Sequence, residues 1–223
     1  MNNLPIYISL TFICTTILTV WLFYRATNFS KTPLIILLVW ATFQSFLGIM
    51  AFYQNLDAFP PRFLLLLVPA IITIILLFSL PKGQAFIDSL SLERLTILHI
   101  VRVPVEVVLF WLFMQKTIPQ LMTFEGRNFD ILAGISAPIA YYFVFVKHNM
   151  SKKKLLVWNI ICLGLLLNIV VNAILSVPLP FQQFAFEQPN VAIFYFPFNL
   201  LPSVIVPLVL FSHLVVIRKL LRE

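Results

Sequence analysis

Three side chains that could do chemistry share one face of a predicted helix. His99, Arg102 and Glu106 stand at positions i, i+3 and i+7 of the apolar run 92–115. At about 100° per residue they lie within roughly 60° of one another. An arginine at the centre of a membrane helix costs about 2.5–3.5 kcal/mol. If this run crosses a membrane, the stripe is therefore expected to face the interior of a helix bundle.

Two interpretations of this stripe stay open. Arg102 and Glu106 are spaced i, i+4, so each could lower the cost of burying the other's charge. Pro104 between them leaves the Ile100 carbonyl without its helical donor, which predicts a kink. In the first interpretation the ion pair only locks this helix among its neighbours. In the second the stripe binds a ligand or a proton, because intramembrane ionisable residues are functional candidates by default.

Further polar residues are predicted in the outer half of the neighbouring helices. Asn168 and Asn172 are spaced i, i+4, and Asp130 begins a helix just after Arg127. Each has a plainer role, since Asp130 could cap its helix and the asparagines could bond between helices. Together with the stripe they outline an outward-opening polar pocket. The residues predicted to bind a ligand are Arg102, Glu106, His99, Asn168, Asn172, Asp130 and Arg127. His213 is expected to be a packed, hydrogen-bonded histidine.

The composition places these elements in a membrane. The 223 residues are 61% hydrophobic and 10% charged, with a mean hydropathy of +1.01. A soluble domain is usually about 45–50% apolar and about 25% charged, so too little polar surface remains here to cover a core in water. Soluble enzymes, secreted disulfide scaffolds and disordered proteins are therefore excluded. Cys14 and Cys162 lie in apolar runs and are expected to pack as small hydrophobes rather than to form a disulfide.

Seven apolar runs are long enough to cross a membrane, which takes about 20 helical residues. They are too long for barrel strands and lack a two-residue alternation. The chain is therefore predicted to be one all-α integral membrane domain, 1–223, formed by a seven-transmembrane-helix bundle. The predicted helices cover about 4–24, 33–53, 63–80, 92–115, 130–147, 155–176 and 198–217.

The positive residues set the expected orientation. Eleven of the fifteen Lys and Arg fall in the first, third and fifth breaks and the C-terminal tail, and only Arg62, Lys116 and Arg127 lie on the opposite side. Because positive residues favour the cytoplasmic side, the N-terminus is predicted outside and the C-terminus in the cytoplasm. The net charge of +7 is therefore attributed to membrane orientation and not to nucleic-acid binding.

Two further features concern the layout. The run 155–176 repeats the Leu-Leu-Val-Trp of 33–53, and Leu210–Ser212 matches Leu77–Ser79. A parallel 3+1+3 repeat of this kind is a transporter pattern. The layout resembles the SWEET-type sugar transporters, although their helix-borne Pro-Gln motifs are absent. The longest break, 177–197, is rich in aromatic residues, so it is expected to rest on the outer interface or to cover an outward-facing cavity.

A second resemblance covers roughly residues 100–217. These residues are similar to the pattern of a broad bacterial seven-pass family with no assigned function, which implies a bacterial inner-membrane location and no chemistry. Members often carry an acid near the position of Asn168, and the amide here argues against a proton relay through that helix. The matching positions are Arg102, Trp111, Pro119, Gly126, Asp130, Gly134, Ala137-Pro138, Trp158-Asn159, Leu175-Ser176-Val177-Pro178, Pro202, Pro207 and His213.

The leading functional prediction is a small multi-pass transporter or ligand-binding protein with a pocket for a small or amphiphilic molecule. The alternative is a non-transporting sensor or partner protein whose Arg102–Glu106 pair is structural, and a third hypothesis is an intramembrane enzyme. No enzyme is expected, because no nucleophile pair is found and the three histidines are separated without metal-ligand spacing. No metal, cofactor or nucleic acid is therefore predicted. The expected partners are the lipid bilayer and a small-molecule or lipid ligand.

Overall fold

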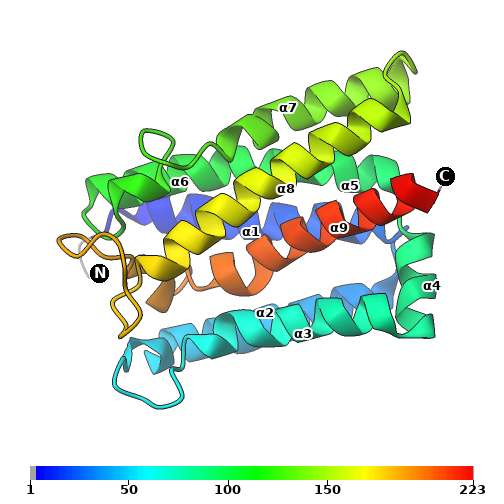
Figure 1. Cartoon of the computed structure of the whole chain (residues 1–223). Coiled ribbons are helices and arrows are strands. Elements are labelled where there is room, and N and C mark those ends of the chain that lie inside the picture. The colour runs from blue at the N-terminus through cyan, green and yellow to red at the C-terminus, as the bar shows by residue number, and fades with distance from the viewer. Residues whose placement is uncertain (1–3, 223) are drawn as a thin grey trace.

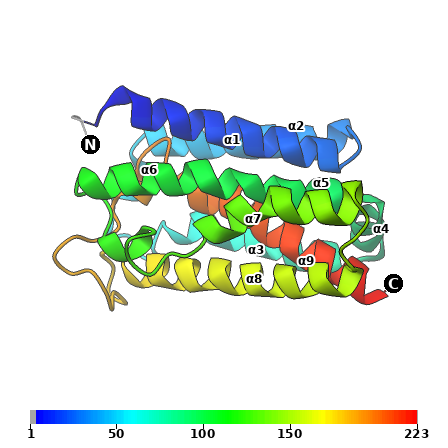
Figure 2. The ribbon, with the colours of Figure 1, turned by 90° about the horizontal axis from the view of Figure 1, so that it is seen from above.

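The computed structural model describes residues 4–222 as a bundle of long helices that run roughly side by side (Figures 1 and 2). No strand occurs within these residues, so the predicted all-α class is confirmed. The helices are α1 (Ile6–Ala26), α2 (Lys31–Ile49), α3 (Leu64–Ser79), α4 (Pro81–Ser89), α5 (Leu92–Leu98), α6 (Arg102–Met114), α7 (Ile131–Tyr141), α8 (Lys152–Leu175) and α9 (Val206–Arg222).

Several of these helices are long and apolar enough to cross a membrane, which indicates a membrane protein. Five stretches of the described chain qualify on their own: α1, α2, Leu92–Met114, α8 and Leu201–Arg222. A sixth is counted if α3 and α4, which bend by 92° at Leu80, form one broken span. Ile131–Val146 is a shorter apolar helix. The short helix α4 lies in the segment predicted to be a break between two spans.

The stretch Leu92–Met114 is not uniformly α-helical. It tightens into a 3-10 turn over His99–Val101, between α5 and α6. Pro104 explains this position, because it has no N–H to donate to the Ile100 carbonyl and its ring crowds the preceding turn. The irregularity expected from the sequence is therefore found one turn before the proline.

Two other prolines free a carbonyl that a side chain of α2 then satisfies. Pro69 leaves the Leu65 carbonyl of α3 without a helical donor, and Gln44 donates to it at 3.1 Å. In the same way Pro207 frees the Ser203 carbonyl, and the Trp40 indole donates to that oxygen at 2.9 Å.

Trp40 and Gln44 are one helical turn apart, so one face of α2 donates hydrogen bonds to free carbonyls of two neighbouring elements. These elements are α3 and the π-helical turn Leu201–Ile205 that leads into α9. The Gln44 bond joins α2 to α3, and the Trp40 bond fastens this hairpin to the rest of the bundle.

The helices that the candidate 3+1+3 repeat aligns can be compared in the structure. The repeat aligns α2 with α8 and α3 with α9. However, α9 lies in the interior between α8, α5 and α3, whereas α3 is at the edge of the bundle and buries only Leu66 and Ile74 of its sixteen residues. The aligned helices therefore occupy different environments, and the repeat stays a prediction from the sequence.

Helix α7 begins about halfway along the α5–α6 stretch (Figure 2). The Tyr141 hydroxyl near its end donates to Glu93 Oε1 at 2.7 Å, and Asp130 just before its start contacts Arg102. α7 therefore runs antiparallel from the level of Arg102 to that of Glu93. Since Met114 lies twelve residues beyond Arg102, the chain returns about 18 Å from the end of α6 before α7 starts.

The irregular segment 115–130 makes this return, and it bonds largely to itself. The Gly126 and Asn128 N–H groups donate to the Thr123 carbonyl, and the Thr123 hydroxyl donates to the Gln120 carbonyl at 2.9 Å. Thr123 and Asn128 are fully buried. Phe124, Arg127 and Phe129 of the same segment are exposed, so it is buried only in part. It carries Asn128 and Asp130 into the bundle.

Gly134 allows α7 to approach α6 closely, and this leads to a prediction. A Cβ at Gly134 would lie 2.8 Å from Val103 Cγ2 and 2.9 Å from the Val103 backbone nitrogen, whereas one at Gly164 in α8 would meet nothing within 4 Å. We expect Gly134→Ala to lower the thermal unfolding temperature in detergent, because backbone must move. Gly164→Ala is the matched control and should leave it unchanged or slightly raised. Equal effects of the two substitutions would contradict the close approach.

Candidate functional site

Arg102 is the centre of a buried group of polar side chains. Its Nη1 donates to Asp130 Oδ1 at 2.9 Å and to the Cys162 carbonyl at 3.3 Å, and its Nη2 lies 2.7 Å from His213 Nε2. The residue is only 2% exposed. One guanidinium therefore links the start of α7, the middle of α8 and the middle of α9. We call the group formed by His99, Arg102, Glu106, Asn128, Asp130, Asn159 and His213 the polar cluster.

The contacts of His213 fix its tautomer. A guanidinium has only donors, so the His213 Nε2 beside Arg102 must accept and carries no proton. His213 Nδ1 then bears the hydrogen and donates to Asn159 Oδ1 at 2.9 Å. The Asn159 amide nitrogen in turn donates to the Leu155 carbonyl at 3.1 Å. The bonds from Arg102 through His213 and Asn159 to Leu155 therefore run in one direction and hold a neutral imidazole in one orientation.

Asn128 connects Glu106 to the start of α7. Its amide nitrogen donates to Glu106 Oε1 at 2.6 Å and to the Met122 carbonyl at 3.0 Å, while its Oδ1 accepts the Asp130 N–H at 3.0 Å. Asp130 occupies the residue before α7, but its carboxylate makes no capping bond to that helix. The carboxylate is held by Arg102 instead, so its predicted role as a helix cap is wrong.

His99 is buried without any hydrogen bond. Its ring stacks on His213 with centroids 3.8 Å apart and planes 15° from parallel, and it meets the edge of Trp158 at 5.8 Å. Neither ring nitrogen has a partner in the protein, and the same holds for Glu106 Oε2 and Arg102 Nε. The polar cluster therefore has a satisfied part around His213 and Asn159, and an unsatisfied part around His99 and Glu106.

The predicted pairing of Arg102 with Glu106 is wrong. No ion pair joins the two residues, and the partner of Arg102 is Asp130. Nη1 and Nη2 of Arg102 already have partners in Asp130 before α7, in α8 and in α9, and Glu106 bonds to Asn128 instead. Helical spacing ranks only partners within one helix, so it could not identify a carboxylate 28 residues away.

The predicted site residues fall into two groups. The structure brings His99, Arg102, Glu106 and Asp130 together in the polar cluster. It does not bring in Asn168, whose amide donates to the Arg127 carbonyl at 2.8 Å, or Asn172, which donates to the Asn168 carbonyl at 2.8 Å. Arg127 is exposed and lies over the Phe184 ring.

Three members of the polar cluster, Asn128, Asn159 and His213, were not predicted as site residues. Asn128 and Asn159 are both fully buried. Asn159 carried a usable signal, because it is a polar residue inside an apolar run. His213 was predicted as a packed, hydrogen-bonded histidine, and the structure confirms this.

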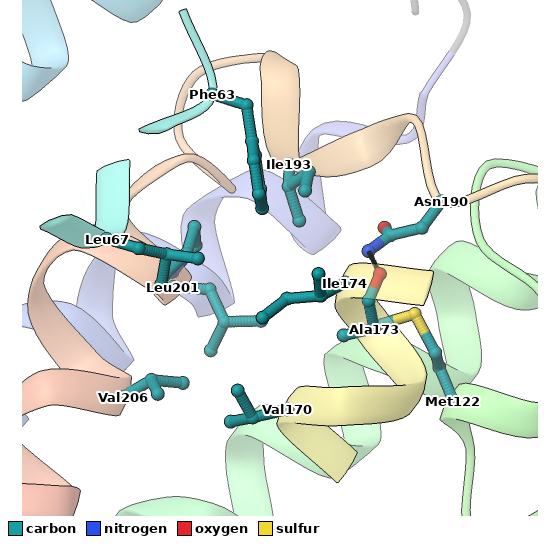
Figure 3. Close-up of a pocket in the computed structure, with 11 residues that line it drawn as sticks. Phe63, Leu67, Met122, Val170, Ala173, Ile174, Asn190, Ile193, Leu201 and Val206 are labelled. Atoms are coloured by element: carbon teal, nitrogen blue, oxygen red, sulfur yellow. Dashed lines mark hydrogen bonds between the residues drawn. The ribbon is translucent and has the colours of Figure 1, made fainter. Parts of the chain in front are cut away.

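The cavities described here lie elsewhere. One of about 50 Å³ sits between α3, α8 and the turn before α9 and is lined mainly by apolar side chains such as Leu67, Val170 and Val206 (Figure 3). Asn190 borders it and donates to the Ala173 carbonyl at 3.3 Å. A larger cavity lies between α1 and α2. Neither is lined by the polar cluster, whose members are at most 5% exposed. The polar cluster is therefore closed in this structure.

The Arg102–Asp130 pair gives a stability prediction. Replacing one partner strands a buried charge, so Arg102→Met and Asp130→Leu should each lower the free energy of unfolding by about 3–5 kcal/mol. The double variant Arg102→Met/Asp130→Leu should lose much less than the sum of the two. Unfolding in detergent, followed by circular dichroism, measures all three. Asp88→Asn is the control, because Asp88 pairs with Arg218 and Arg222 while about half exposed, so its loss should stay below about 1 kcal/mol. Additive losses at Arg102 and Asp130 would contradict the pairing.

Comparisons with known proteins agree with the predicted resemblance to an uncharacterised family. No curated protein and no solved structure matches the chain. A family described as a domain of unknown function, DUF8737, matches residues 59–221. The match contains the whole polar cluster and begins after α1 and α2. The chain therefore belongs to the family defined by the domain of unknown function DUF8737.

Proposed function

We propose that the chain is a small seven-span transporter of the cell membrane, whose substrate site is the polar cluster in a closed state. The seven spans are α1, α2, α3 with α4, the α5–α6 stretch, α7 with the turn Tyr142–Val146, α8 and α9. The N-terminus lies outside, as the 11-to-3 distribution of positive residues favours. This arrangement places Arg102 near the middle of the membrane.

The unpartnered atoms of His99, Glu106 and Arg102 carry the proposal. Buried polar groups in native proteins nearly always have hydrogen-bond partners, and each one left alone costs about 1–3 kcal/mol. Four such atoms lie within two helical turns of each other: both ring nitrogens of His99, Arg102 Nε and Glu106 Oε2. None of them has a hydrogen-bond partner. The guanidinium nitrogen is a donor, Glu106 Oε2 can accept, and a neutral imidazole offers one of each. A small hydroxyl-bearing molecule, which both donates and accepts, would satisfy them.

The half-length helix α7 supports the same proposal. Transporters often build midplane sites from discontinuous helices, where irregular backbone and helix ends meet the substrate. In this chain α7 begins at the level of Arg102, and the irregular segment 115–130 lies between the polar cluster and the outer end of α6.

Opening the site would require this segment to move together with the loop 177–197. The two are joined at several points. The Val191 and Ala192 N–H groups both donate to the Thr117 carbonyl, at 3.1 and 3.2 Å. Gln188 Nε2 donates to the Ile118 carbonyl at 2.5 Å. The loop and the segment would therefore act as one outer cover.

One observation favours the alternative of a non-transporting sensor or partner protein. Three protein groups on three helices already hold the head of Arg102, as expected of a residue that only fastens the bundle. The two functions differ in whether the polar cluster ever opens to water.

Cys162 tests this difference, because its carbonyl bonds to Arg102 and the residue is only 3% exposed. The Cys14→Ser variant, in sealed liposomes, leaves Cys162 as the sole cysteine. A transporter should let a membrane-impermeant methanethiosulfonate label Cys162 slowly, from one face or both, while the protein stays folded. Labelling is read by mass spectrometry.

A matched variant calibrates the assay. Glu187→Cys in a Cys14→Ser/Cys162→Ser background places the thiol at an exposed position in the loop 177–197 and should react at once. If Cys162 reacts only after denaturation while this control reacts freely, the transport proposal fails and the structural role of Arg102 is favoured.

A further inference from the structure

A cavity of about 530 Å³ runs along the groove between α1 and α2. It is lined by Ile17, Trp21 and Tyr24 of α1, by Leu38 and Ala41 of α2, and by Phe196 beneath them. Its volume falls in the range of about 300–1,000 Å³ typical of small-molecule sites. The lining of α1 spans Ile13 to Tyr24, so the groove is about 16 Å long. Both helices precede the segment that matches the family, and neither carries a member of the polar cluster.

The surface of the groove suits a hydrocarbon chain. Two of its hydroxyl groups bond within their own helices, since Thr16 donates to the Phe12 carbonyl at 3.0 Å and Ser45 to the Ala41 carbonyl at 2.7 Å. Bonded in this way, they add little polarity to an apolar wall. Ile17 is 64% exposed and Leu38 is 50% exposed, so the groove opens on the surface that the bilayer covers.

Two positive charges stand at one end of the groove. The Arg25 guanidinium lies 4.9 Å from the centre of the Trp21 ring, and Lys31 begins α2. No carboxylate within residues 4–222 forms an ion pair with either residue. The neighbouring Arg94 differs, because it donates to the Arg25 carbonyl at 2.5 Å and lies over the Phe29 ring. Arg25 and Lys31 are thus the positive residues that could bind an anion at this end of the groove.

We propose that one anionic phospholipid occupies this groove, with an acyl chain between α1 and α2 and its phosphate at Arg25 and Lys31. Charge complementarity favours an anionic headgroup, because juxtamembrane Lys and Arg attract anionic lipids. A helix of a second copy fits poorly. With a diameter of about 10 Å it would fill roughly 1,200 Å³ over the length of the groove, about twice the cavity.

Native mass spectrometry of the full chain in mild detergent tests this lipid site. With equal phosphatidylglycerol and phosphatidylcholine added, the wild type should retain one phosphatidylglycerol in about fivefold preference. Arg25→Gln/Lys31→Gln should abolish this preference while an acyl chain still binds. The control Lys153→Gln/Lys154→Gln, which removes two exposed charges elsewhere, should keep it.

Filling the groove tests the acyl chain separately. Ala41→Trp and Thr42→Trp both line the groove and should reduce retention of either lipid by about fivefold. Val39→Trp is the control on α2, because Val39 is 65% exposed and lies outside the groove lining. Retention that is unchanged in both groove variants, equal retention of the two lipids by the wild type, or a lipid-free dimer that Ala41→Trp disrupts would each overturn the proposal.

Discussion

Hydrocarbon leaves a backbone polar group no water to bond, so every such group inside the membrane needs a partner in the protein. This constraint explains the position of α2. The prolines of α3 and α9 each free a carbonyl, and Gln44 and Trp40 supply the missing donors. Helix α2 buries little else, since only Gln44 and Gly48 of its nineteen residues are buried. Leu34, Leu37, Trp40 and Ala41 are only partly buried but pack against the core, so α2 contributes apolar contacts as well as these directional hydrogen bonds.

The same constraint separates two parts of the polar cluster. His213 bonds to Arg102 Nη2 on one side and to Asn159 on the other, and Asn159 bonds to the Leu155 carbonyl, so the polar atoms of the His213 ring are both satisfied. His99 lies against His213 by ring stacking alone and has no polar partner. The hydrogen-bonded part of the polar cluster, around His213 and Asn159, thus positions the part around His99, whose ring nitrogens have no partner. Preorganisation of this kind lowers the entropy lost when a ligand binds.

Local periodicity predicted the helices and the residues that share a helix face. Contacts between helices depend on long-range geometry, which periodicity does not encode. The apolar runs predicted the long helices, and the 3.6-residue period placed His99, Arg102 and Glu106 on one buried face. The partner of Arg102 was missed because Asp130 reaches it through an irregular segment whose path no periodicity encodes. The short helix α4 was missed because its residues are mixed in polarity and follow a 92° bend. Asn168 and Asn172 lie apart from the polar cluster, because Asn168 bonds to the Arg127 carbonyl and Asn172 bonds to Asn168 one turn before it.

The ion pair of Arg102 also has a consequence for how the protein is made. Asp130 follows Arg102 by 28 residues and His213 follows it by 111, so the helix that carries the arginine is synthesised before either partner. It must enter the bilayer on the strength of its apolar residues, which offset about 2.5–3.5 kcal/mol for the lone charge. The arginine then attracts α7 first and α9 last. The order of these residues in the chain thereby becomes the order of assembly, and α9 completes the bonds of an arginine that is synthesised 111 residues before His213.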